Sequence, residues 1–206
     1  MNREFLYFIP GFVLGLTLHE FSHAWVATRL GDPTARAAGR LTLNPLAHLD
    51  LLGSLMLLAV GFGWAKPVPV DLRHFRSPRR DMALVAFAGP LSNLLLAAVI
   101  GLALRTLGLF AGELPDTAVR MIFYGVWINI ILAVFNLIPI PPLDGSRILH
   151  GVVPLGWQAG YASFERVGPL LLFGLMLLAS FTGVSIFGRI LTPIAGPIAN
   201  WILGHA

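Results

Sequence analysis

The sequence predicts an all-α polytopic membrane protein, a bundle of four to six transmembrane or re-entrant helices with a small extended or β element. Of the 206 residues, 56% are hydrophobic and only 12% are charged, so a soluble bundle of this length would lack polar side chains to cover it. Apolar runs that suit a hydrocarbon core of about 30 Å recur along the chain. The basic residues gather between these runs, as the positive-inside rule describes.

The first apolar run, residues 4–30, predicts a membrane-crossing helix. The run is too long for the apolar region of a signal peptide, so we expect a retained span. Small or potentially metal-binding residues recur at every fourth position, and these are Gly11, Gly15, His19, His23 and Ala27. Glycines at this spacing let a second helix approach closely, so this face is expected to dock on a neighbour.

Shorter elements are expected after this helix. Residues 39–45 alternate in a way that predicts a short strand closed by a turn. Residues 51–65 are apolar but span only about 22 Å as a helix, so we expect a re-entrant segment rather than a crossing. In residues 66–71 two prolines two positions apart exclude a central strand and favour an edge strand or extended segment.

Three further spans are expected. One covers residues 82–109, and the next begins near residue 119 and ends in residues 136–145, where three prolines in four residues cannot continue an α-helix. The last covers residues 167–181. Residues 184–203 are also apolar, but Arg189, Pro193, Pro197 and Asn200 leave their path open.

The basic segments predict the topology. Residues 29–40 and 66–80 are both rich in arginine or lysine, and both are expected to be cytoplasmic, which requires that residues 51–65 do not cross. The span that ends near Asp144 then returns to the cytoplasmic side. His19 and His23 lie toward the same end of their own helix, so the three residues are expected at one depth.

Composition also limits the function classes. The absence of cysteine removes disulfides, thiolate zinc sites and cysteine nucleophiles. The net charge of +4 does not indicate a nucleic-acid partner, because the basic residues are confined to loops beside apolar segments. We expect one membrane-embedded domain over residues 1–206, with the lipid bilayer as its surroundings.

The most informative motif is His19-Glu20-Phe21-Ser22-His23. On a helix, His19 and His23 lie about 40° apart in azimuth and one turn apart in height, so they can bind one metal ion together. Glu20 is then the carboxylate that takes a proton from the attacking water. Polar groups within a membrane span indicate function by default, whereas the alternative is a pair of histidines that hydrogen-bond between helices.

A catalytic zinc ion usually has three protein ligands, so one remains to be found. Asp144 is the best candidate, because it lies on an unwound, proline-defined backbone at the matching depth. The alternative role of Asp144 is to cap the segment that follows Gly145. Turns, caps and solvation explain three other carboxylates better, and these are Asp32, Asp50 and Asp71.

These residues resemble the site-2 protease family of intramembrane zinc metallopeptidases. His19 to His23 is similar to the family's first motif, and Asn136 to Gly145 is similar to its N-x-x-P-x-x-x-L-D-G motif. Three further stretches are also similar to the family, and they are residues 39–45, 63–70 and 89–93. His48 matches a family stretch too, but the sequence does not define a role for it. The resemblance covers roughly residues 10–150.

The resemblance implies a zinc cofactor, with Asp144 as third ligand, and hydrolysis of a peptide bond in or near the transmembrane helix of a protein or peptide substrate. It also suggests a substrate-contact or oxyanion role for Asn136, and Asn93 is a second candidate for binding the substrate. Hydrogen bonding between helices is the alternative for both asparagines. For Asn136 we further expect a hydrogen bond to a substrate strand that adds to residues 66–71.

Two rival functions remain open at this stage. One is a membrane zinc-binding protein or scaffold without proteolysis, which has no need of a general base such as Glu20 next to a ligand. The other is a metallopeptidase for soluble substrates that is only anchored by helices, and this function requires a metal site outside the bilayer.

Overall fold

The computed structural model describes residues 3–60, 63–108, 115–182 and 186–204. Within these residues the secondary structure is helical. The α-helices are α1 (Arg3–Arg29), α2 (Thr34–Ala37), α3 (Leu51–Val60), α4 (Pro78–Gly108), α5 (Asp116–Asn136), α6 (Asp144–Val152), α7 (Gln158–Thr182) and α8 (Ile186–Leu203). Three short 3₁₀ helices, η1 (Pro45–Ala47), η2 (Leu72–His74) and η3 (Leu155–Trp157), lie between them.

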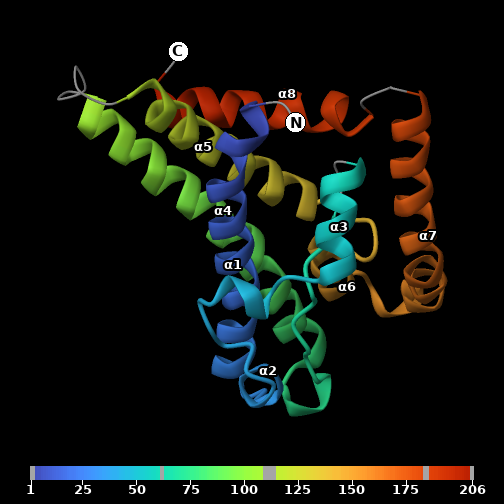
Figure 1. Cartoon of the computed structure of the whole chain (residues 1–206). Coiled ribbons are helices and arrows are strands. Elements are labelled where there is room, and N and C mark those ends of the chain that lie inside the picture. Colours follow the sequence, from blue (N-terminus) through green and yellow to red (C-terminus); the bar gives the residue numbers. More distant parts are fainter. Residues whose placement is uncertain (1–2, 61–62, 109–114, 183–185, 205–206) are drawn as a thin grey trace.

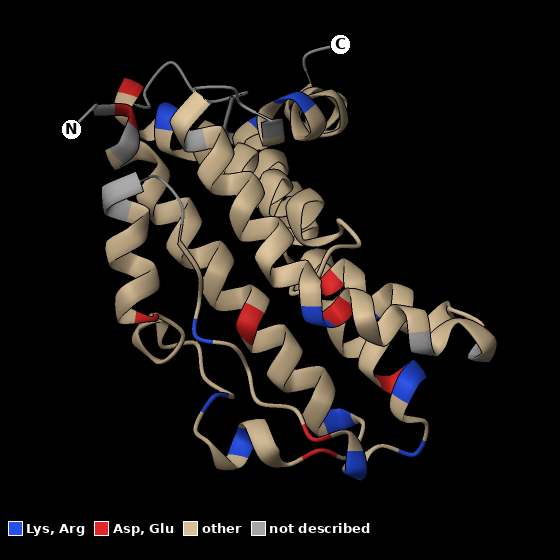
Figure 2. Cartoon of the chain, turned by 90° about the vertical axis from the view of Figure 1, so that its right-hand side faces the viewer, with Lys and Arg blue, Asp and Glu red and all other residues tan. Residues whose placement is uncertain are grey.

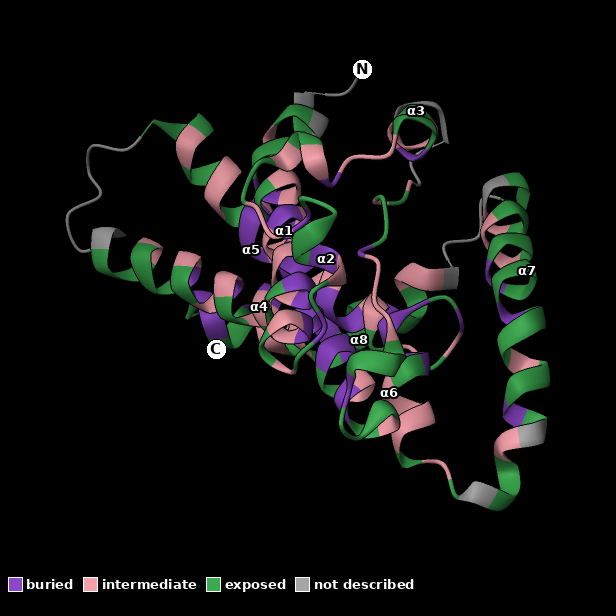
Figure 3. Ribbon diagram, turned by 90° about the horizontal axis from the view of Figure 1, so that it is seen from below, coloured by how far each residue is buried: buried purple, intermediate pink, exposed green. Residues whose placement is uncertain are grey.

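Helices α1, α4 and α5 pack against one another and form the centre of the molecule (Figure 1). Glycine permits the contact between α1 and α5, because a Cβ atom on Gly11 would lie 2.5 Å from the Cα atom of Gly125. Helix α8 lies across the end of α4 and α5, where Leu191 and Ala195 join a buried apolar cluster with Val126 and Ile130. Buried residues concentrate where these helices meet (Figure 3).

Three helices of the described chain are long and apolar enough to cross a membrane, and they are Pro78–Thr106, Asp116–Asn136 and Gly160–Ala179. Helix α1 has a similar length, 27 residues, and is not among the three, for which only the described residues were searched. Helix α3 has 10 residues, or about 15 Å, and is too short to cross. These findings confirm the predicted all-α membrane fold.

Helix α7 stands apart from α1, α4 and α5 in both Figure 1 and Figure 3. It is joined to the rest through α6 and η3, and the hydroxyl of Tyr161 donates a hydrogen bond to the backbone carbonyl of Ser146. Large apolar side chains along α7 are exposed, up to 86% for Phe181. In a bilayer this surface faces lipid or another apolar helix.

Some helices begin earlier than the apolar runs predicted. Helix α4 begins at Pro78 and α7 at Gln158. Their first turns carry polar side chains, so a prediction based on apolar runs leaves these turns out. Residues 186–203, whose path the sequence left open, form one continuous helix. Its two prolines are four positions apart, so they remove backbone donors from one face only.

The predicted strand over residues 39–45 is wrong. The chain turns there, with a positive φ of 69° at Gly39, and then enters η1, where the Asn44 side chain accepts a hydrogen bond from the backbone of Leu46. In the described residues the β structure is one isolated bridge, between Leu49 and Ala65. The physical reason is that the Arg40 side chain binds the backbone carbonyls that a neighbouring strand would have used.

Most of the lysine and arginine residues lie at one end of the bundle, the end where α1 finishes and α4 begins (Figure 2). This end holds both basic segments, residues 29–40, which include α2, and residues 66–80 (Figure 1). The two segments therefore share one side of the molecule, as the re-entrant path of residues 51–65 requires.

Candidate metal centre

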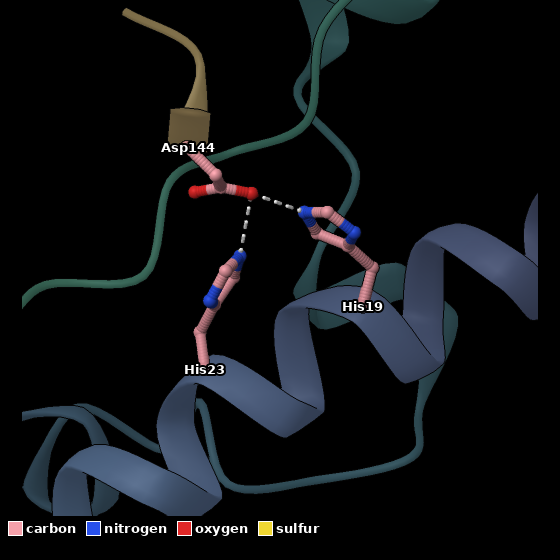
Figure 4. A group of neighbouring side chains, drawn as sticks. All are labelled: His19, His23 and Asp144. Atoms are coloured by element: carbon pink, nitrogen blue, oxygen red, sulfur yellow. Dashed lines mark ion pairs between the residues drawn. The ribbon is translucent and has the colours of Figure 1, made fainter. Parts of the chain in front are cut away.

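His19 and His23 project from one face of α1, in the interior of the bundle (Figure 4). Their side chains are buried, and the ring centroids lie 4.6 Å apart. This proximity follows from the spacing of four residues, which stacks side chains one turn apart.

Asp144 reaches the histidines from the first residue of α6 (Figure 4). Its Oδ2 atom lies 3.0 Å from Nε2 of His19 and 3.3 Å from Nε2 of His23. The chain returns from the end of α5 through a tight loop, and Gly145 permits that loop. A Cβ atom at Gly145 would lie 2.3 Å from the carbonyl oxygen of Leu137.

The second nitrogen of each imidazole is held by a hydrogen-bond acceptor. Nδ1 of His19 lies 2.7 Å from Oδ1 of Asn93, and Nδ1 of His23 lies 2.7 Å from the backbone carbonyl of Val85. Both oxygens only accept, so each Nδ1 carries a hydrogen and donates it. In each neutral ring, Nε2 then offers its lone pair toward Asp144.

This arrangement fits a zinc ion. Oδ2 of Asp144 is buried without a hydrogen-bond partner, so three lone pairs converge on one point. Atoms that bind one zinc ion tetrahedrally at about 2.0–2.1 Å lie roughly 3.3 Å apart, close to the distances found here. Gly89 keeps the space open, because a Cβ atom there would lie 2.5 Å from Nε2 of His23 and 2.6 Å from Nε2 of His19.

Glu20 and the three clustered residues line a cavity of about 470 Å³. Glu20 itself is 8% exposed, so its carboxylate is largely shielded from solvent. Apolar side chains make up most of the remaining wall, among them Phe12, Leu16, Val68, Val70, Leu132 and Phe135. The cavity therefore offers an apolar surface with a few polar groups beside the histidines.

The two asparagines named as substrate contacts occupy different places. Asn136 lines the cavity, and its amide nitrogen donates to the carbonyl of Leu132 in its own helix. Asn93 is 0% exposed and does not line the cavity, because its amide is engaged by His19, Gly15 and Asn129. These contacts place Asn93 behind His19 and favour hydrogen bonding between helices, the alternative role, over contact with substrate.

The other carboxylates considered as ligands lie elsewhere, and among the described residues the group able to hold a metal ion is His19, His23 and Asp144. Asp50 directly precedes α3 and accepts a hydrogen bond from the backbone of Gly53 in its first turn. Asp71 pairs with Arg73.

Asp32 has a structural role near the end of α1. Burial raises the pKa of this carboxyl, but hydrogen bonds from Thr34 and from the backbone of Asp71, with nearby His74, hold the pKa below its usual range. Asp32 thereby ties the end of α1 to the end of residues 66–71.

One wall of the cavity is held by a buried arginine that sequence reasoning assigned only to a strand. Arg40 is 5% exposed and donates hydrogen bonds to the backbone carbonyls of Lys66 and Pro67. His48 is 0% exposed and supports the same wall, because its carbonyl accepts a hydrogen bond from the backbone of Lys66. In the sequence, an arginine next to a glycine in a turn looks the same whether its side chain is buried and holds a wall or is exposed to solvent.

Comparison with known proteins identifies the relationship that this geometry suggests. The sequence model of peptidase family M50 matches residues 106–179. A Bacillus subtilis protein named Putative zinc metalloprotease YwhC is 42% identical over 167 residues, which cover 79% of this chain and 76% of that protein. The chain belongs to peptidase family M50, the site-2 proteases. It is thus a membrane zinc metallopeptidase.

Other members of family M50 are also similar. Rip2 of Mycolicibacterium smegmatis, which carries the same designation, is 32% identical over 84% of this chain and 67% of its own length. MJ0611 of Methanocaldococcus jannaschii, again so designated, is 30% identical over 72% of this chain and 73% of its own length. No solved structure matches the chain.

Proposed function

We propose that His19, His23 and Asp144 hold the zinc ion of this peptidase, and that it cleaves a peptide bond within or next to the transmembrane helix of a protein substrate. The observation that carries the proposal is the convergence of three buried ligand atoms on a largely apolar cavity inside the bundle. His23 lies six residues before the end of α1, or about 9 Å along the helix, so the cluster lies within the bundle rather than at its surface.

The chemistry divides between the metal and the chain. When bound, zinc activates a water molecule and polarises the scissile carbonyl. Glu20, next to His19 and on the same cavity, accepts the proton that the attacking water loses. It then donates this proton to the departing amine. The apolar walls limit the access of bulk water to these steps.

A helical substrate has to be opened before attack, because its backbone carbonyls are hydrogen-bonded within the helix. Opening it in lipid leaves groups without partners, at a cost of several kcal/mol each. Residues 66–70 supply an extended wall beside the cluster, and Pro67, Val68 and Val70 line the cavity. We assign this wall, together with Asn136, to hold the unwound substrate as an added strand.

The cleavage site is assigned to the cytoplasmic side of the membrane. The two basic segments lie at one end of the bundle, and the positive-inside rule places that end in the cytoplasm (Figure 2). His23 is nearer to this end of α1 than to its first residue. We further propose that such cleavage releases a cytoplasmic fragment of the substrate.

The direct test is cleavage of a transmembrane peptide by the detergent-solubilised protein, with products mapped by mass spectrometry. We expect cleavage within or next to the apolar segment, loss of cleavage with a zinc chelator and recovery when zinc is returned. Cleavage that persists after complete zinc removal, or that occurs only in soluble unstructured peptides, would contradict the proposal.

A further inference from the structure

We infer that Arg147 selects substrates that carry an aspartate or glutamate one or two residues from the cut, on the side that faces the basic end of the bundle. Arg147 is then a specificity-determining residue of the cavity. The inference rests on the proposed function, because it names the class of transmembrane substrate that the same cavity takes.

Arg147 brings a positive charge to a largely apolar cavity. It lines this cavity together with Glu20 and Asn136, and it is the one lysine or arginine that does so among the described residues. The residue is exposed, so it lies at the edge of the cavity and not deep inside it. A peptide that enters the cavity therefore passes this charge.

The guanidinium of Arg147 is free to bind a substrate. Other arginines of this region are engaged, because Arg40 donates to backbone carbonyls of the 66–70 wall and Arg79 donates to backbone carbonyls near the end of α6. Within the described part of the chain, no hydrogen bond or ion pair engages Arg147. Its five N–H donors form a planar fork that fits a carboxylate.

The fold places Arg147 between the metal cluster and the basic end of the bundle. Helix α6 begins at Asp144, and the carbonyls of His150 and Val153 at its other end accept hydrogen bonds from Arg79. Arg79 lies in the first turn of α4, which belongs to the basic end (Figure 2). Helix α6 therefore runs from the cluster toward that end, and Arg147 lies three residues, or about 4.5 Å, along it.

Glu20 lies on the opposite side of the cluster. It precedes His23 by three residues on α1, which finishes at the basic end, so Glu20 is about 4.5 Å farther from that end than His23. An extended substrate rises about 3.3 Å per residue. A side chain one or two residues from the cut toward the basic end therefore lies beside Arg147, whereas one on the other side lies nearer to the negative charge of Glu20.

This arrangement of charge discriminates among transmembrane segments. Their cytoplasmic flanks are commonly rich in lysine and arginine, and Arg147 repels a basic side chain at the corresponding place. An acidic side chain there forms an ion pair with two parallel hydrogen bonds instead. The preferred substrate is therefore a transmembrane segment that carries an acid close to the cut on its cytoplasmic side.

The test uses the full-length protein in detergent and three transmembrane peptides that differ at one residue. This residue is the second from the mapped cut toward the cytoplasmic flank, and it is Glu, Gln or Lys. Arg147→Glu reverses the charge and Arg147→Gln removes it, whereas Arg80→Glu is the matched control, because Arg80 is exposed and does not line the cavity. The readouts are kcat/KM for each peptide and, with Glu20→Gln added, the Kd of each uncleaved peptide.

Wild type and Arg80→Glu should prefer the Glu peptide over the Gln peptide about fivefold, the upper end for an ion pair that water reaches, and should cleave the Lys peptide least. Arg147→Gln should treat the three peptides alike, and Arg147→Glu should prefer the Lys peptide. The Kd values should follow the same orders. Moving the variable residue to the other side of the cut should abolish the preference for Glu.

Equal kcat/KM and equal Kd for the three peptides in wild type would overturn the inference, while continued cleavage would leave the proposed function standing. The wild-type order of peptides in Arg147→Glu would also overturn it, because another group would then read the charge. If Arg147→Glu does not fold or lacks zinc, Arg147→Gln decides, and a retained preference for Glu contradicts the inference. Absence of cleavage with the expected order of Kd would count against the proposed function and still support selection by Arg147.

Discussion

Oδ2 of Asp144 lies 3.0 Å from Nε2 of His19, yet the two residues belong to α6 and α1, which are separated in the chain by α2, α3, α4, α5 and a proline-rich loop. That loop folds back onto the end of α5 because Gly145 has no Cβ atom to strike the Leu137 carbonyl. The position of the carboxylate therefore depends on backbone geometry and not on its neighbours in α1.

The first prediction concerns this carboxylate. Asp144→Asn should lower both zinc content and peptide cleavage, because a neutral amide is a poorer ligand for a dication than a carboxylate. Zinc content of the purified variant, measured by mass spectrometry, checks the result. Full occupancy with wild-type affinity would show that a different acid completes the site.

A second prediction concerns the cavity wall. Arg40→Lys keeps the positive charge but replaces a planar group that binds the carbonyls of Lys66 and Pro67 together. We expect kcat/KM for a transmembrane peptide to fall about tenfold, or about 1.4 kcal/mol, near the low end for a hydrogen bond to a charged group. Zinc content should stay at the wild-type value.

Arg76→Lys is the control for this variant, because Arg76 is exposed at the same end of the bundle. Equal activity of the two lysine variants would show that Arg40 does not maintain the wall. Loss of zinc in Arg40→Lys would instead assign Arg40 to the metal cluster.

The third prediction tests strand addition by the substrate. Val68 lies between Pro67 and Pro69, so its N–H is the one backbone donor in that run. Val68→Pro should reduce cleavage of a stable helical peptide much more than cleavage of a peptide loosened by glycine or proline near the cut. Equal losses on both peptides, with zinc content and fold intact, would rule out a strand at this edge.

Sequence patterns predicted the features that depend on local geometry. The four-residue spacing of His19 and His23 specifies their proximity wherever α1 lies, and the depth argument for Asp144 agrees with its place in the structure. The resemblance to family M50 rested on the same residues and is confirmed by the relatives.

Features that depend on the rotation of one helix against another were not predictable. Asn93 and Asn129 face each other only because α1, α4 and α5 approach closely at glycines, so the sequence did not distinguish hydrogen bonding between helices from substrate binding. The predicted strand over residues 39–45 failed for a similar reason. The side chain of Arg40 reaches across space to carbonyls that a backbone pattern assigns to a strand.

The central claim is that Glu20 acts as general base at a zinc ion inside the membrane bundle, and one paired measurement tests it most directly. Wild type and Glu20→Gln are compared for zinc content and for cleavage of the same transmembrane peptide. The amide keeps the shape of the side chain but cannot accept the proton, so we expect equal zinc and a loss of cleavage of about 10²–10⁴-fold. Cleavage by Glu20→Gln within about tenfold of wild type, at equal zinc, would contradict the account.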